Sequence, residues 1–116
     1  MAASKASFRD LEIWKSGIDL MVRVYALTAG LPATERFNLT AQLNRSALSV
    51  PTNIAEGWGR GLGGNQVQFI KIARGSLYEV LFLLEATKAL NLAPPTQIVT
   101  LSERLRGLGK APQCLS

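Results

Sequence analysis

Positively charged side chains and one tryptophan are the main candidates for functional residues in this sequence. Lys71 and Arg74 are close enough along the chain for a helix to place both side chains on one face, where they could contact phosphate groups. Trp58 precedes Arg60 in a glycine-rich stretch, and an exposed indole beside an arginine could stack on an unpaired base. We therefore predict nucleic-acid contacts at Arg45, Trp58, Arg60, Lys71 and Arg74.

Each of these residues also has an ordinary structural interpretation, which the sequence leaves open. Trp58 could pack over the end of a helical bundle while Glu56 pairs with Arg60. Lys71 and Arg74 could form a solvated cationic face, with Arg74 lying over Tyr78 one turn later. A cationic surface therefore suggests a polyanionic partner without requiring one.

Catalytic and metal-binding residues are scarce. The chain has no histidine, and its single cysteine, Cys114, lies close to the C-terminal end, so a Cys/His zinc site and a thiol nucleophile paired with histidine are excluded within one chain. Glu56 and Tyr78 could transfer protons, but no paired carboxylate motif or nucleophile elbow accompanies them. We predict that the protein is not an enzyme and needs neither a metal nor another cofactor.

Composition bounds the class of protein and its surroundings. The 116 residues are enough for one domain, and 13 Lys and Arg against 8 Asp and Glu give a formal net charge of +5. That excess favours a polyanionic partner, although it is also consistent with simple solubilising charge. The N-terminal residues contain no apolar core typical of a signal peptide, and the longest apolar run, 80–84, is too short to span a bilayer. We expect a cytoplasmic protein.

Hydrophobic periodicity predicts that the positions of interest lie on helices. The first helix should end at Gly30, followed by Pro32 in the turn, and Gly17 in its middle should let another backbone approach closely. The second helix should begin at about Thr34 or Glu35 and run to Glu56. On the first helix, the apolar stripe expected to face the core of the protein is Leu11, Trp14, Ile18, Met21 and Tyr25. On the second helix, the corresponding stripe is Leu39, Leu43, Ala47, Val50 and Ile54.

The second helix carries a polar stripe beside its apolar one, and Pro51 interrupts it. Because proline cannot donate the helical hydrogen bond, we expect a kink at Pro51 rather than an end of the helix. The polar stripe could form a buried network between helices, a subunit contact or a wall that faces a ligand. Its members are Gln42, Arg45, Ser49, Asn53 and Glu56.

The third helix is predicted from about Gln66 to Asn91, after a loop in which Asn65 caps the helix. It is apolar on more than one face, and a helix of that kind needs more than one packing partner. One seam, from Phe69 through Ala73, Leu77, Val80 and Leu84 to Thr87, should face the core. Four further apolar residues extend the apolar surface beyond this seam, and we predict a subunit interface there: Ile70, Leu81, Phe82 and Leu83.

A short fourth helix completes the prediction. Thr96 can cap it, it should end near Gly107, and its apolar stripe is Val99, Ser102, Leu105 and Leu108. Residues 1–7 are expected to form a disordered N-terminus, 8–108 the folded unit and 109–116 a flexible tail. The fold class is all-α, an antiparallel four-helix bundle with a Pro-kinked second helix and a short fourth helix.

One pattern of residues covers most of the chain. Its densest part comprises residues 42–51 and 53–57 with Arg60, and further matches are Leu11, Trp14, Pro32, Glu35, residues 72–77 and Glu79. At this spacing, over about residues 8–92, the chain resembles the four-helix-bundle family of proteins encoded by intervening sequences in bacterial large-subunit ribosomal RNA genes.

The resemblance implies properties that the residues alone do not. Members of that family are small basic helical bundles that form homopentamers, and the accessory proteins of diversity-generating retroelements are similar to them in fold. Those accessory proteins bind nucleic acid and a reverse transcriptase. The implied partners of this chain are therefore further copies of itself, RNA or DNA, and a reverse transcriptase.

Two functional hypotheses follow from the sequence. In the first, the chain is an oligomeric nucleic-acid-binding accessory protein whose repeated cations contact phosphates in concert. In the second, it is a homo-oligomeric protein-interaction scaffold with no nucleic-acid role, which uses the apolar surface of the third helix. A contiguous basic surface would favour the first hypothesis, and basic residues dispersed among acidic ones would favour the second.

Overall fold

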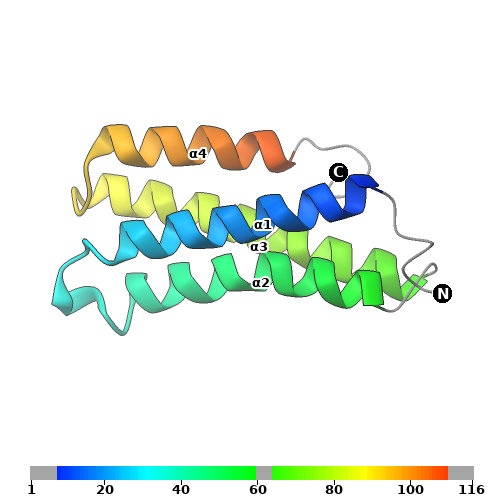
Figure 1. Ribbon diagram of the computed structural model, residues 1–116. Coiled ribbons are helices and arrows are strands. Elements are labelled where there is room, and N and C mark those ends of the chain that lie inside the picture. The colour runs from blue at the N-terminus through cyan, green and yellow to red at the C-terminus, as the bar shows by residue number, and fades with distance from the viewer. Residues whose placement is uncertain (1–7, 60–63, 110–116) are drawn as a thin grey trace.

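Four α-helices make up almost all of the described chain (Figure 1). The computed structural model describes residues 8–59 and 64–109, and within these ranges it contains no β-strand. The helices are α1 (Phe8–Thr28), α2 (Leu39–Gly59), α3 (Gly64–Ala89) and α4 (Pro95–Gly109), with a 3-10 turn, η2 (Ala33–Glu35), between the first two helices. The prediction of an all-α, four-helix protein is confirmed. Residues 1–7 and 110–116, assigned above to the disordered N-terminus and the tail, lie outside the described residues.

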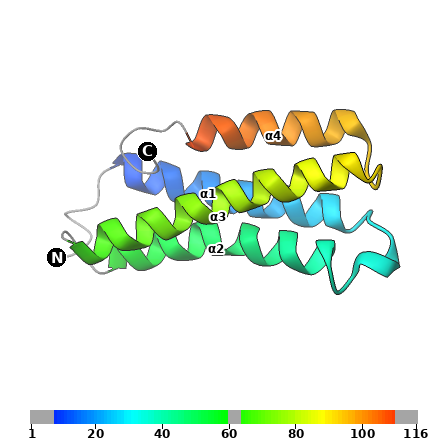
Figure 2. The ribbon, with the colours of Figure 1, turned by 180° about the vertical axis from the view of Figure 1, so that it is seen from behind.

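Consecutive helices run in opposite directions along the 47 Å long axis of the molecule, as the colour sequence shows from both sides (Figures 1 and 2). In the views shown, α2 lies below α1 and α3, and α4 lies above them. The α2 helix packs most extensively on α3 and next on α1, whereas α4 packs more sparsely on α3 and α1. The short connections between the helices account for this sequence of directions.

The core is formed by one buried apolar stripe from each helix. The stripe predicted for α2 is confirmed, because all five of its residues are buried. The α3 seam from Ala73 to Thr87 is buried as predicted, and Phe69 at its start is half-buried. On α4 the buried positions are Ile98, Leu101, Ser102 and Leu105, while Val99, predicted to face inward, is exposed.

The predicted core face of α1 is wrong by about one helical position. The buried apolar residues are Ile13, Leu20, Val24 and Leu27. In the stripe predicted above, Trp14, Ile18 and Met21 are half-buried and Tyr25 is 42% exposed. The helix has two apolar stripes that are displaced by one position along the chain. Because consecutive positions point about 100° apart around a helix, burying one stripe leaves the other at the side of the helix.

Gly17 lies within the stripe of α1 that is actually buried. A Cβ atom at Gly17 would lie 3.3 Å from the Cβ atom of Pro51 in α2. The expectation that this glycine permits a close approach is therefore confirmed, and the approaching residue is the proline itself. The α2 helix is continuous through Pro51, and the kink expected there stays a prediction.

The ends of α2 and α3 differ from the prediction. A turn of 3-10 helix occupies Ala33–Glu35, so α2 begins at Leu39 instead, where the Gln42 amide donates to the Asn38 carbonyl. At its other end α2 continues past Glu56 to Gly59, and α3 begins at Gly64, so Asn65 lies inside the helix rather than capping it. The glycine-rich loop is consequently shorter than predicted.

Candidate functional site

The central residues of the polar stripe of α2 lie against α3. The Ser49 and Ser76 hydroxyl oxygens are 2.7 Å apart, and Asn53 Nδ2 donates to the Ser49 hydroxyl and carbonyl oxygens at 2.9 and 2.8 Å. All three side chains are partly buried. The centre of the stripe is therefore a hydrogen-bonded network between helices. On either side of it, Arg45 and Glu56 are exposed, and Gln42 at the start of the stripe is half-buried.

A second polar contact joins α1 to α2. The Thr28 hydroxyl donates to Asn44 Oδ1 at 2.8 Å and also lies 3.1 Å from the carbonyl oxygen of Tyr25. Thr28 is buried and Asn44 is half-buried. A buried hydroxyl without a partner would cost free energy, and the bond to Asn44 removes that cost. The same bond joins the end of α1 to the first half of α2.

The structure brings together only part of the predicted nucleic-acid-binding set. Lys71 is exposed and Arg74 half-buried on the outer face of α3, and Tyr78, 56% exposed, is the next side chain along that face. Neither cation forms an ion pair with another described residue. The cation–π contact considered above between Arg74 and Tyr78 is also absent from the part of the chain that the structure describes.

The other predicted contacts lie elsewhere. Because α2 and α3 run in opposite directions, Arg45 lies on the far side of the Ser49–Ser76 contact from Lys71. Trp58 is half-buried in the last turn of α2, and Arg60 lies outside the described residues. Arg45 and the Lys71–Arg74 pair therefore do not form one compact site.

The four residues predicted for a subunit interface likewise do not lie on one exposed face. Ile70, Leu81 and Leu83 are partly buried and pack against the core of their own subunit. Phe82 is 69% exposed. Since consecutive helical residues point about 100° apart, the three residues from Leu81 to Leu83 cannot share one face, and only Phe82 projects outward.

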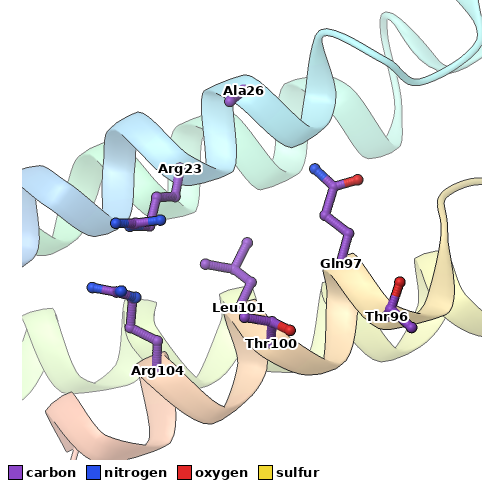
Figure 3. A pocket seen from close by; sticks show the side chains of 7 residues that line it. All are labelled: Arg23, Ala26, Thr96, Gln97, Thr100, Leu101 and Arg104. Atoms are coloured by element: carbon purple, nitrogen blue, oxygen red, sulfur yellow. The ribbon is translucent and has the colours of Figure 1, made fainter.

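A cleft between α1 and α4 was missed by the sequence analysis (Figure 3). It encloses about 380 Å³, and its walls include Arg23 of α1 and Gln97, Thr100, Leu101 and Arg104 of α4. Figure 3 shows the two guanidinium groups facing each other across the gap, with Gln97 and Leu101 extending from α4 toward α1. This is a candidate binding site formed by two elements that are far apart in the sequence.

Asp19 holds the two arginines at one end of this cleft. Its Oδ2 atom accepts from Arg23 Nε at 2.9 Å and from Arg104 Nη1 at 3.2 Å. A neighbouring cavity of about 300 Å³ is lined by Ser16, Asp19 and Leu105, among others. The acid-first spacing of Asp19 and Arg23 was visible in the sequence, but it indicates an ordinary solvated pair unless the position of α4 is known.

Within the described ranges, no group of three or more His, Cys, Asp or Glu side chains could hold a metal ion. None of the helices is both long enough and apolar enough to cross a membrane, again judged on the described residues.

These observations define a class: a small all-helical protein of four helices, with a polar network between α2 and α3 and no metal cluster among the described residues. The model of the 23S rRNA-intervening sequence protein family matches residues 9–112. The chain belongs to this family, and the resemblance seen in the sequence is confirmed. A comparison with curated proteins finds none that matches.

Proposed function

We propose that this protein is a non-enzymatic, oligomeric nucleic-acid-binding accessory protein of the cytoplasm, which contacts RNA or DNA phosphates through the outer face of α3. The observation that carries the proposal is the pair Lys71 and Arg74, which lie on one face without an ion-pair partner among the described residues. A cation without a competing carboxylate keeps its full attraction for phosphate. Tyr78 adds an exposed aromatic ring for stacking on an unpaired base.

The charge distribution along α3 supports the same face. Residues 66–78 contain two cations and no acidic residue, whereas Glu79 and Glu85 follow in the second half of the helix. Positive charge is therefore concentrated in the first half of α3. The family name refers to 23S rRNA, which makes RNA the first nucleic acid to test.

Oligomerisation is part of the proposal, because two cations on one subunit bind weakly. Copies arranged in a ring would repeat the pair at fixed spacing, and each further contact would benefit from a high effective concentration. We propose that Phe82, with its large exposed ring, contributes to the subunit contact. Arg45 and Trp58 would then be secondary contacts, each needing a neighbouring subunit to bring it near the α3 face.

The experiment compares two charge reversals of equal size. Lys71→Glu with Arg74→Glu removes the α3 pair, and Lys88→Glu with Arg106→Glu makes the same change in net charge at two other exposed cations. Lys88 is about 25 Å further along α3, at a rise of 1.5 Å per residue. Light scattering with a short structured RNA, at low and then moderate salt, reports both the mass of the assembly and RNA binding.

We expect the first variant to lose RNA binding while its assembly mass stays unchanged, and the second to bind RNA like the original protein. Binding by the original should also weaken as salt rises, because counterions compete for phosphate. Equal binding by the two variants would refute the assignment to α3.

The second candidate is a homo-oligomeric protein-interaction scaffold. The exposed ring of Phe82, one turn beyond that of Tyr78, favours it, because exposed apolar groups on a helix commonly mark a protein contact. An assembly that gains no mass with RNA even at low salt would favour the scaffold over nucleic-acid binding.

A further inference from the structure

The cleft between α1 and α4 combines positive charge with hydrogen-bond donors, and none of the described residues that line it is acidic. Arg23 and Arg104 reach it from opposite sides (Figure 3). Two guanidinium groups share the single carboxylate of Asp19, so this cluster keeps one net positive charge. An anion that enters the cleft would therefore meet an excess of positive charge.

Most of the guanidinium donors are unused. Arg23 bonds to Asp19 through Nε, which leaves both terminal nitrogens, and Arg104 bonds through Nη1, which leaves Nε and Nη2. Neither arginine has another hydrogen-bond partner among the residues that the structure describes. A planar guanidinium with adjacent free donors is suited to an anion with several oxygens, which it can bind at two points.

The first turn of α4 lies at the other end of the cleft from Arg104 (Figure 3). Thr96 and Gln97 belong to that turn and both line the cleft, together with the hydroxyl-bearing Thr100. The partial positive charge of a helix start falls off within its first turn, and Arg104 lies about 10 Å further along α4 than Gln97, at a rise of 1.5 Å per residue. The arginines therefore supply the charge that a phosphate would meet, and these three side chains supply hydrogen-bond donors for the rest of a ligand.

The ion pairs with Asp19 would not prevent binding. The side chains of Asp19, Arg23 and Arg104 are 44%, 47% and 53% exposed. Exposed ion pairs contribute little to stability, so the arginines can turn toward a ligand of higher charge at small cost. Asp19 would then act as a competitor that weakens ligand binding and keeps the two arginines in place.

The size and lining of the cleft indicate more than a bare ion. A volume of about 380 Å³ lies in the lower part of the range for small-molecule sites, about 300–1,000 Å³. Leu101 and Ala26 supply an apolar wall beside the polar groups. From charge, donors and volume together, we propose that the α1–α4 cleft binds a small organic phosphate monoester, with its phosphate between Arg23 and Arg104 and its organic part against Leu101.

The test is calorimetric titration of the full chain with a nucleoside monophosphate, inorganic phosphate and the uncharged nucleoside. We expect the monophosphate to bind most tightly, phosphate more weakly and the nucleoside least. Arg104→Gln should weaken monophosphate binding about tenfold, which corresponds to about 1.4 kcal/mol, because it removes a charged donor from the phosphate. Arg106→Gln is the matched control, because it removes the same group from an exposed position on the same helix.

Asp19→Asn separates a binding role from a purely structural one. If the aspartate competes with the ligand, its neutralisation should tighten monophosphate binding several-fold, whereas a residue that only supports the structure would leave affinity unchanged or weaken it. Equal affinity of Arg104→Gln and Arg106→Gln, no monophosphate binding at millimolar concentration, or equal binding of monophosphate and nucleoside would each overturn the proposal. RNA binding through α3 is tested by other variants, so either proposal can fail alone.

Discussion

The two sides of this molecule are held together differently. Between α2 and α3, Gly57 lies so close to α3 that an added Cβ atom would be 3.2 Å from the Gln66 carbonyl oxygen, and the Ser49 and Ser76 hydroxyls are paired. Between α1 and α4 lie two cavities, of about 380 and 300 Å³, bordered by half-exposed ion pairs. The first contact is closely packed, and the second leaves room for a ligand.

The residue types at each contact explain the difference. Ile13 and Leu20 of α1 line the smaller cavity from the core, but the outer edge of α1 beside α4 presents Ser16, Asp19, Arg23 and Ala26, which are polar or small. On α4, the Ser102 hydroxyl is buried without a hydrogen-bond partner among the described residues. An unsatisfied buried hydroxyl has a free-energy cost, so α4 is docked less favourably than α2 and α3 are on each other.

The largest expected effect comes from truncating one core leucine on each side. Leu77→Ala in α3 should lower the free energy of unfolding by about 3–5 kcal/mol, because its close-packed site cannot collapse around the cavity. Leu105→Ala in α4 should cost about 2–3 kcal/mol, because the sparsely packed helix can move inward. Both leucines are almost fully buried, so exposure does not separate them. Urea unfolding followed by circular dichroism, at one protein concentration, measures both values; a larger loss for Leu105→Ala would reverse the comparison.

An intermediate effect is expected from adding a side chain where the packing differs. Gly57→Val should destabilise the protein by about 1–3 kcal/mol, because the neighbouring atoms belong to the backbone and Cβ positions of α3. Gly107→Val in α4 should change stability by less than about 0.5 kcal/mol, since no atom lies within 4 Å of the added Cβ and valine is a slightly better helix former than glycine. The shift of the urea midpoint distinguishes them, and equal shifts would show that α2 and α3 are not closely packed here.

The smallest effect concerns the polar contacts. A double-mutant cycle with Ser49→Ala and Ser76→Ala should give a coupling of about 1 kcal/mol, typical of a partly buried hydrogen bond. The same cycle with Asp19→Asn and Arg104→Gln should give about 0.5 kcal/mol or less, because both side chains are about half exposed. Added salt should reduce the second coupling and leave the first unchanged; a salt-dependent Ser49–Ser76 coupling would contradict this account.

Much of the fold could be predicted because helices are encoded by local periodicity. The buried stripe of α2 and most of that of α3 are as expected, since apolar residues recur at helical spacing along each of them. The inward face of α1 was mispredicted because large residues such as Trp14 and Tyr25 outweighed a stripe that contains Gly17. A glycine contributes nothing to a hydrophobic pattern, although here it marks a close approach of α2 to α1 at Pro51.

The candidate sites were less predictable than the helices, because local periodicity does not show which helices meet. Lys71 and Arg74 share a face because they share a helix, and this could be inferred from their spacing. The arginines of the α1–α4 cleft are 81 positions apart in the sequence, from Arg23 to Arg104, and nothing local relates them. Their relation to Asp19 depends on how α4 docks.

The all-helical class, the four helices and the family can all be inferred from the amino-acid sequence, because periodicity and motif spacing are properties of neighbouring residues. Three features require the folded chain: the apolar stripe of α1 that is buried, the pairing of Ser49 with Ser76, and the two arginines that face each other across a cleft. Burial and charge pairing depend on the surface that lies opposite, and that surface comes from a distant part of the chain.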